Sequence, residues 1–374
     1  MSYNCNTNVQ FYITQGGILM ILVSVQNLTP GMRVGVDIYN LQNQLVLPKD
    51  TVLTQDIIDK LKDHSIHYVK VYEDEHKVSD FESTPSHSEC IKSSRAFQEF
   101  KEEFINTVYI IKDEFNDVVT KHIPINVDKL LERTATVFFK ANGTNIFDML
   151  HNMREYDDST YVHCLNVSLI CGMLAKWLNF SKDDTDILIL AGMLHDIGKL
   201  CVPDTIIKKP EKLSDEEYTI VKTHTTKGYE ILAPQDLPDE VKYAALMHHE
   251  RCDGTGYPKQ LKLEKIDRFA RLVSIADVYD AMTSARVYRG PMSPFAVVDT
   301  FEQEGLYKYD PECILIFLEN IVNTFLENRV LLSDGRKGEI VLINKQALSK
   351  PLIQLEDGFL DLAKHKDISI DKII

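Results

Sequence analysis

Seven polar side chains within or at the ends of apolar, helical stretches constrain the fold of this chain more than any other feature. Asp196 follows His195 in the stretch AGMLHDIGKL, and Asp277 lies within LVSIADVYDAMTS. Burying imidazoles and carboxylates among apolar side chains is unfavourable unless they pair with one another or ligate a metal ion. We therefore predict a mainly α fold, in which a helical bundle encloses one polar centre. Five of the twelve histidines contribute to the full set, which is His163, His195, Asp196, His224, His248, His249 and Asp277.

The residue types of this set indicate a metal site. Imidazole and carboxylate groups together suit divalent iron or manganese, whereas zinc is less typical at high coordination number. Seven ligands exceed what one closed tetrahedral site needs. We therefore predict two divalent metal ions, with Asp196 as the shared ligand. For any single member, such as His163, a core histidine satisfied by a hydrogen bond is the alternative.

The stretch LMHHERCDGTGYP, residues 246–258, leads from the adjacent histidines into a turn. Helical geometry relaxes at a helix end, so two adjacent imidazoles can face one cation there. Glycine permits backbone conformations denied to other residues, and proline stiffens the exit. Tyr257 has three alternative roles: it stacks on a ligand, donates a hydrogen bond, or packs the loop. Beside the metal ions we predict a tightly folded loop that contains Asp253, Gly254, Gly256, Tyr257 and Pro258.

Composition excludes several classes of protein. Hydrophobic residues make up 44% of the 374 residues and charged residues 26%, as in an ordinary globular protein with a core. No apolar run approaches the ~18 residues that span a bilayer, so we expect a cytoplasmic protein without membrane insertion. The formal net charge of −15 disfavours DNA or RNA duplexes as partners. Seven scattered cysteines without a C-x-x-C pair argue against a disulfide framework and a zinc knuckle.

Turn signals and changes of periodicity divide the chain into six segments. The first is polar and featureless, so we expect disorder there, and Met20 could be the natural start. The connecting helices, or the N-terminal module, could form a homodimer. The predicted segments are a disordered leader over 1–19, a small α+β module over 20–76, a polar linker over 77–94, connecting helices over 95–150, a helical catalytic domain over 151–326 and a small β appendage over 327–374.

The order of the motifs is similar to that of one known family. HDIGK, at 195–199, resembles the HD superfamily of metal-dependent phosphohydrolases, and HHERCDGTGYP resembles the signature of its HD-GYP branch. The resemblance runs from about Asp158 to Arg289 and includes HCLNVSLICGMLA, VPDTIIKKPEKLSDEEY, VKTH and IADVYDAMTSARVYR. A lone His-Asp pair carries little weight, whereas the ordered set is specific. The resemblance implies an HD-type helical bundle that hydrolyses cyclic di-GMP, a bacterial second messenger. The expected product is linear pGpG, and whether a second step continues to GMP is left open.

The resemblance also assigns metal ligands. It implies one metal held by His163, His195, Asp196 and Asp277, and a second held by Asp196, His224, His248 and His249. Ser159 stands where members with a third metal carry glutamate, so the resemblance implies two metals rather than three.

Substrate contacts follow from the same resemblance. Lys199 matches the lysine that approaches the scissile phosphate, and Asp280, Arg286 and Arg289 match substrate-contacting positions. Arg289 occupies a position that is often lysine, and Gln260 occupies one that is often glycine, which puts the shape of the loop exit in doubt.

The chemistry follows from the needs of a phosphodiester. Two metal ions ~3.5–4 Å apart would lower the pKa of a bridging water, and hydroxide would attack phosphorus in line with the departing 3′ oxygen. Lys199 would steady the developing charge, unless it is only a surface lysine at a helix end. Arg286 would contact phosphate or guanine, or else form a structural ion pair. Asp280 would contact substrate, or else orient a metal ligand. Two alternative functions remain. One is the same metal chemistry on another cyclic dinucleotide or on a nucleotide monophosphate, and the other is a catalytically silent sensor of cyclic dinucleotides.

Overall fold

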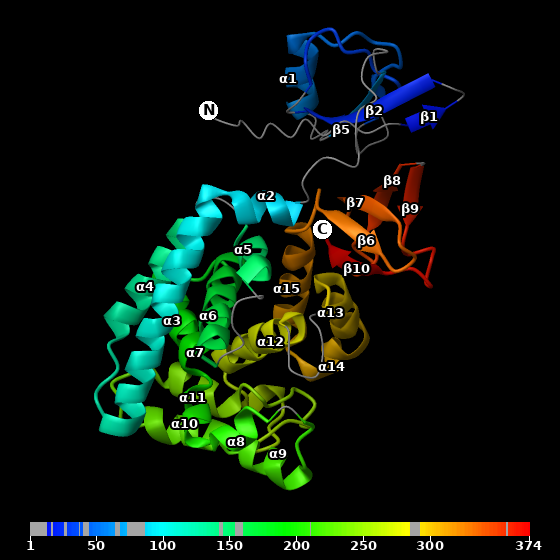
Figure 1. Cartoon of the computed structure of the whole chain (residues 1–374). Coiled ribbons are helices and arrows are strands. Elements are labelled where there is room, and N and C mark those ends of the chain that lie inside the picture. Colours follow the sequence, from blue (N-terminus) through cyan, green and yellow to red (C-terminus); the bar gives the residue numbers. More distant parts are fainter. Residues whose placement is uncertain are drawn as a thin grey trace. The chain divides into compact units, whose positions relative to one another are not determined.

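The computed structural model describes residues 13–15, 18–25, 28–36, 38–39, 45–63, 68–72, 87–141, 145–153, 160–209, 211–284, 292–356 and 358–374 (Figure 1). The chain forms two compact units, one of residues 1–84 with 355–359 and the other of residues 85–354 with 360–374. Within the described ranges, no helix has both the length and the apolar character needed to cross a membrane.

The first unit contains a small α+β fold. Val23, Leu61 and Val71 are buried together in its apolar core. Its three-stranded antiparallel sheet has the order β1-β2-β5, and β3 pairs with β4 in a second sheet. The elements are β1 (Ile13–Gln15), β2 (Ile18–Ser24), β3 (Ile38–Tyr39), β4 (Leu45–Leu47), α1 (Gln55–Asp63) and β5 (Tyr68–Tyr72).

Part of the segment expected to be a disordered leader is ordered. Ile13 pairs with Met20, and Gln15 pairs with Ile18, in an antiparallel β1-β2 ladder. The prediction of disorder over 1–19 is therefore wrong for residues 13–15 and 18–19, because main-chain pairing with β2 satisfies their backbone groups. Residues 1–12 lie outside the described part of the chain.

The second unit is a helical bundle, which confirms the predicted mainly α fold. Its first helices are α2 (His87–Ser93), α3 (Arg95–Lys121), α4 (Val127–Lys140), α5 (Ile146–Met153), α6 (Thr160–Trp177) and α7 (Lys182–Leu194). They are followed by the 3₁₀ helix η2 (Ile197–Cys201), α8 (Asp204–Ile207), α9 (Asp215–Lys222), α10 (His224–Leu232), α11 (Asp239–Met247), the 3₁₀ helix η3 (Leu263–Lys265) and α12 (Arg268–Thr283). The last are α13 (Pro294–Thr300), the π-helix η4 (Phe301–Gly305), α14 (Leu306–Lys308) and α15 (Pro311–Asn323).

Helix α6 lies at the centre of this bundle. Every residue from Cys164 to Cys171 is buried, as expected for a helix that is apolar on all sides. Helices α3, α4, α7 and α12 pack around it (Figure 1). The helices predicted to connect modules over 95–150 thus belong to the same compact unit as α6. Helix α2 occupies residues 87–93 of the predicted polar linker, a correction explained by its packing on α3 and α5.

Two capped helices fix the segments that carry predicted ligands. Ser181 Oγ accepts a hydrogen bond from the Asp184 amide at the start of α7, whose end precedes His195. Ser214 and Glu217 form a complete capping box at the start of α9, which ends two residues before His224. Both serines thus satisfy backbone amides that have no partner within the first turn of the helix.

A small antiparallel sheet follows the helices, as predicted. Its strand order is β10-β6-β7-β8-β9, and a turn with Gly335 at φ +88° joins β6 to β7. Ser293, at the start of α13, donates a hydrogen bond of 2.8 Å to the Ile370 carbonyl and so links the sheet to the bundle. The strands are β6 (Arg329–Leu332), β7 (Lys337–Leu342), β8 (Leu352–Leu355), β9 (Gly358–Asp361) and β10 (Ile370–Ile373).

Candidate metal centre

Separate segments of the bundle bring the seven predicted ligands together. His163 lies in the first turn of α6, and Asp277 lies on the buried side of α12. The junction between α7 and η2 supplies two neighbours, His195 and Asp196. The remaining three come from the start of α10 and the end of α11, and they are His224, His248 and His249.

One half of the centre joins α6, α7 and α12. His163 Nε2 lies 3.0 Å from Asp277 Oδ1 and 3.5 Å from Asp196 Oδ2. His195 Nε2 lies 3.3 Å from the same Asp196 oxygen and 3.9 Å from Asp277 Oδ1. One ligand atom from each of His163, His195 and Asp277 falls within 4.8 Å of the other two, which is close enough for a shared cation.

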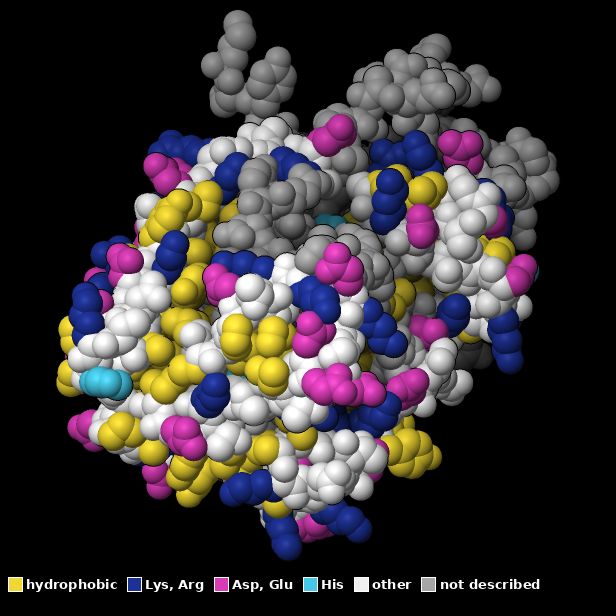
Figure 2. Space-filling view, turned by 60° about the horizontal axis from the view of Figure 1, so that its bottom comes forward, with side chains coloured by type: hydrophobic (Ala, Val, Ile, Leu, Met, Phe, Trp, Pro, Cys, Tyr) yellow, Lys and Arg dark blue, Asp and Glu magenta, His cyan; other side chains and the backbone are white. Residues whose placement is uncertain are grey.

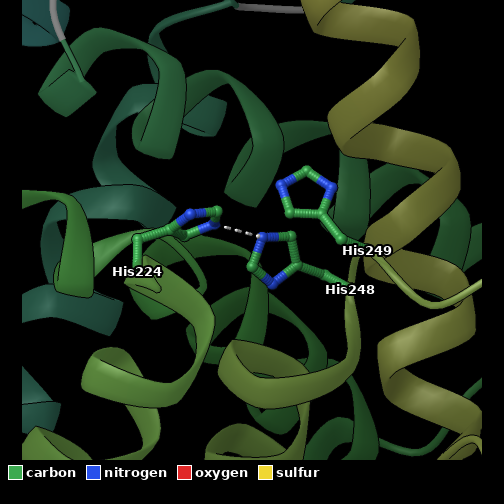
Figure 3. A group of neighbouring side chains, drawn as sticks. All are labelled: His224, His248 and His249. Carbon is green, nitrogen blue, oxygen red and sulfur yellow. Dashed lines mark hydrogen bonds between the residues drawn. The ribbon is translucent and has the colours of Figure 1, made fainter. Parts of the chain in front are cut away.

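The other half joins α10 to the end of α11 (Figure 3). The Nε2 atoms of His224 and His248 are 3.2 Å apart, and a ring nitrogen of His249 lies within 4.8 Å of both. Asp196 Oδ1 lies 3.3 Å from His224 Nε2 and 3.7 Å from His248 Nε2. The two oxygens of Asp196 therefore face different halves of the centre.

Backbone carbonyls determine which ring nitrogens face inward. The Nδ1–H of His195 donates to the Gly192 carbonyl at 2.7 Å, that of His224 to Val221 at 2.7 Å, and that of His248 to Ala244 at 2.9 Å. A carbonyl can only accept, so each neutral ring turns an Nε2 lone pair toward the centre. Three lone pairs and a carboxylate that converge on one place are the arrangement of a metal site.

Buried atoms at the centre lack hydrogen-bond partners. Among the described residues, His195 Nε2 and Asp196 Oδ1 are buried and accept no hydrogen bond. Leaving such groups unsatisfied costs free energy, which a cation beside each of them would remove. The residues present thus fit divalent metal ions.

Burial and neighbouring charges set the ionisation of these groups. Burial lowers the pKa of His224, and it lowers that of His248 well below the usual value. Burial also lowers the pKa of His249 to about 3. Burial opposes the charge on Asp196, yet the Lys199 ammonium holds the pKa of this carboxyl well below its usual range. Neutral imidazoles with an ionised carboxylate are the forms that bind metal.

The sequence profile of the HD domain family matches residues 126–313, which is half of the chain and contains all seven predicted ligands. The chain belongs to the HD domain family. The helical bundle and the His-Asp pair at 195–196 are therefore its HD domain and HD motif.

Several proteins are similar to part of the chain. The chain is 37% identical over 196 residues to a cyclic di-GMP phosphodiesterase of Thermotoga maritima, covering 51% of this chain and 53% of that protein. It is 35% identical over 208 residues to a cyclic di-GMP phosphodiesterase of Pseudomonas aeruginosa, covering 55% and 50%. It is 40% identical over 145 residues to a 3′3′-cGAMP-specific phosphodiesterase of Vibrio cholerae, covering 39% and 34%. The chain thus spans about half the length, or less, of these relatives. Together with the family match, they confirm the predicted membership of the HD-GYP branch.

Behind the HD motif, Asp280 supports His163. The Nδ1–H of His163 donates to Asp280 Oδ2 at 2.7 Å, and Asn166 Nδ2 donates to the other Asp280 oxygen at 3.0 Å. Burial would lower the pKa of His163, but the hydrogen bonds to Asp277 and Asp280 raise it to about 9. Asp280 is itself buried. Of its two predicted roles, this placement favours orienting a ligand over contacting substrate.

Lys199 lies in η2, one turn after the HD motif. Its ammonium forms an ion pair with Asp196 Oδ2, and its side chain is 21% exposed. The group therefore reaches the centre while part of the side chain remains open to solvent. This placement argues against the alternative of a surface lysine at a helix end.

The GYP loop, which we define as the loop predicted to contain Asp253, Gly254, Gly256, Tyr257 and Pro258, packs beside His249 and His224. Gly254 has φ +84°, and a Cβ on Gly256 would lie 2.4 Å from the Arg251 amide nitrogen, so both positions require glycine. Asp253 Oδ1 accepts hydrogen bonds from the amide and the hydroxyl of Thr255 and closes the turn. The Tyr257 ring lies 4.7 Å from the His249 ring, centroid to centroid, and it precedes Pro258 through a cis peptide bond.

The exit of the loop keeps a glycine-like shape without glycine. Gln260 has φ +55°, a left-handed conformation that glycine adopts most readily. Gln260 thus adopts at the loop exit a backbone conformation in which a glycine would be less strained.

Two residues of the HD-GYP stretch were missed as functional candidates. Glu250 is buried, and its two oxygens accept hydrogen bonds from the Lys259 amide at 2.6 Å and the Leu261 amide at 2.9 Å. The Arg251 guanidinium donates to the His248 carbonyl and to Ser274 Oγ. Together they fix both ends of the loop. Their place directly after the paired histidines was the available signal.

Three residues discussed from sequence lie outside the described part of the chain. They are Ser159, Arg286 and Arg289. Their predicted roles stay predictions.

Proposed function

We propose that this protein is a metal-dependent phosphodiesterase that hydrolyses cyclic di-GMP to linear pGpG. The observation that carries the proposal is the convergence of three inward-facing Nε2 atoms on the Asp196 carboxylate. The relatives from Thermotoga maritima and Pseudomonas aeruginosa bear this activity in their names.

Two divalent metal ions, iron or manganese, are the proposed cofactors. One would be held by His163, His195, Asp196 and Asp277, and the other by Asp196, His224, His248 and His249. The support is the division of the cluster into two halves, with one Asp196 oxygen toward each. When bound, such a pair neutralises phosphoryl oxygens and makes water an effective nucleophile at neutral pH.

The chain's own groups would place and stabilise the substrate. The Lys199 ammonium, beside Asp196 and partly exposed, can neutralise negative charge that develops on the phosphoryl group. Asp280 holds His163 in one ring orientation, and Glu250 holds the loop that carries Tyr257. These contacts keep the site in shape before substrate arrives, which lowers the reorganisation needed during the reaction.

Chromatography of the reaction products tests the proposal. Protein purified without oxygen and loaded with iron or with manganese should convert cyclic di-GMP to pGpG, and an Asp196→Asn variant should not. Binding without any linear product under both metals would indicate the catalytically silent sensor instead.

A second substrate is favoured by one observation. The chain is 40% identical over the shared region to a 3′3′-cGAMP-specific phosphodiesterase. Parallel reactions with 3′3′-cGAMP should therefore be followed, and a higher kcat/KM for it than for cyclic di-GMP would change the proposed substrate but not the chemistry.

A further inference from the structure

An exposed aromatic side chain lies in the helix that ends two residues before His224, and no contact among the described residues gives it a role in holding the ligands. Tyr218, in α9, is 46% exposed. Lys222, one turn later in the same helix, places its ammonium 4.7 Å from the centre of the Tyr218 ring. The same ammonium lies 5.8 Å from the centre of the Tyr257 ring. We call Tyr218, Lys222 and Tyr257 the aromatic row.

The aromatic row leads directly to the predicted ligands. Tyr257 lies against His249, and its ring centre is 6.5 Å from that of His224, which begins the next helix after α9. A molecule with its phosphate at the centre therefore has an aromatic and cationic surface next to it. Packing of the loop explains Tyr257, but it does not explain the exposed ring of Tyr218.

The charge of the molecule makes such a local surface useful. The chain carries a formal net charge of −15. On the face in Figure 2, basic and acidic side chains are interspersed with apolar ones rather than gathered into one basic area. Because the net charge disfavours long-range attraction of anions, a cation close to the predicted ligands, such as Lys222, would help to hold an anionic ligand.

We infer that the aromatic row is a purine-binding subsite, in which a base of the substrate stacks on Tyr218 and the Lys222 ammonium reinforces the contact. The inference rests on the proposed function, because a cyclic dinucleotide with one phosphate at the metals must extend a base away from them. A flat exposed ring is suited to any purine, since stacking depends on the π face and not on a hydrogen-bond pattern. The row would therefore give affinity for purines without choosing between guanine and adenine.

Kinetics of Tyr218 variants test the subsite. Tyr218→Ala should raise KM for cyclic di-GMP about tenfold and leave kcat within about twofold, because stacking is lost while the metals stay in place. Tyr218→Phe should behave as the wild type, since it keeps the ring. Tyr109→Ala removes another exposed tyrosine, in α3, and serves as the matched control. Unchanged KM in Tyr218→Ala would overturn the subsite.

Calorimetry with small ligands separates this inference from the proposed function. GMP has a purine and a phosphate but no phosphodiester bond, and ribose 5-phosphate has the phosphate alone. In metal-loaded protein, Tyr218→Ala should weaken GMP binding about tenfold and leave ribose 5-phosphate binding unchanged. Equal weakening of both would overturn the subsite. If Tyr218→Ala binds GMP more weakly than the wild type does, but the wild type makes no linear product, the proposed phosphodiesterase is overturned and the subsite stands.

Discussion

The Nε2 atoms of His224 and His248 lie 3.2 Å apart. In both rings the Nδ1–H already donates to a backbone carbonyl, so a neutral ring has no proton on Nε2. A hydrogen bond between these atoms would require one ring to be charged. Burial opposes that charge, because it lowers the pKa of both histidines. A cation that accepts both lone pairs resolves the conflict, so metal occupancy should govern both the stability and the composition of this centre.

Removal of His248 should reduce the metal content. His248→Ala takes one proposed ligand from the half of the centre that contains His224, so we expect the protein to lose about one metal ion per chain. Elemental analysis of anaerobically prepared protein measures this. His365→Ala, an exposed histidine far along the sequence, is the control. An unchanged metal content in His248→Ala would refute its assignment as a ligand.

Chelation should destabilise the folded protein. A metal that binds only the native state at a concentration 100 to 1,000 times its Kd adds about 3–4 kcal/mol to the free energy of unfolding. Treatment with a chelator should therefore lower Tm, and added manganese should restore it. Thermal unfolding in both states is the measurement, and an identical Tm with and without chelator contradicts a metal-dependent core.

Asp280→Asn should weaken metal binding. The carboxylate accepts the His163 Nδ1–H, and loss of such a partner typically lowers metal affinity about 10–100-fold. Competition with a coloured chelator measures the affinity. Metal affinity equal to that of the wild type, together with a raised KM, would show that Asp280 contacts substrate instead.

Gly256→Ala should distort the GYP loop. The added Cβ would meet backbone atoms of Glu250 and Arg251 at 2.4 Å, and a forced fit of this kind costs about 1–3 kcal/mol or more. The shift would also displace His249. Denaturant unfolding and metal analysis report the two effects. Gly228→Ala, whose new Cβ would meet neighbours no closer than 3.5 Å, should be much milder, and equal effects would contradict the steric explanation.

Glu339 in β7 should make stability depend on pH. Burial, and then the charge of Glu327, raise the pKa of Glu339 to about 7, and its Oε1 accepts no hydrogen bond among the described residues. Because the pKa in the folded state exceeds the ordinary value, the native state holds the proton more tightly. Stability is therefore lost as pH rises from the ordinary pKa to about 7.

Substitution of Glu339 should remove this loss. Glu339→Gln should stabilise the protein at pH 8 by an amount on the order of 1–2 kcal/mol, and by little at pH 5. Tm measured at both values tests the prediction, with Asp371→Asn, an exposed carboxylate of the same sheet, as the control. A gain that is equal at the two pH values would contradict it.

The centre could be predicted from sequence because residue type and position carried the information. Imidazoles and carboxylates at the ends of apolar helices are costly to bury unless they pair or bind a metal ion. The sequence therefore predicted that His195, Asp196 and His248 lie in one polar centre. The helical bundle and the small C-terminal sheet followed in the same way from periodicity and turns.

Other features depend on tertiary placement that no local pattern contains. Whether Asp280 faces a ligand or the substrate depends on the packing of α12 against α6, which brings it to His163. Glu250 stands directly after the paired histidines, but only the folded loop shows that its carboxylate accepts hydrogen bonds from two loop amides. The strand Ile13–Gln15 was missed because its partner, not its own composition, orders it.

Asp196 occupies the junction between α7 and η2, and each of its oxygens faces a different set of histidines. One carboxylate thus serves both halves, so a mutation at Asp196 should remove both ions, whereas a mutation at one histidine should remove only the ion of its own half. The single residue on which the whole centre depends is therefore the aspartate at this junction and none of the histidines around it.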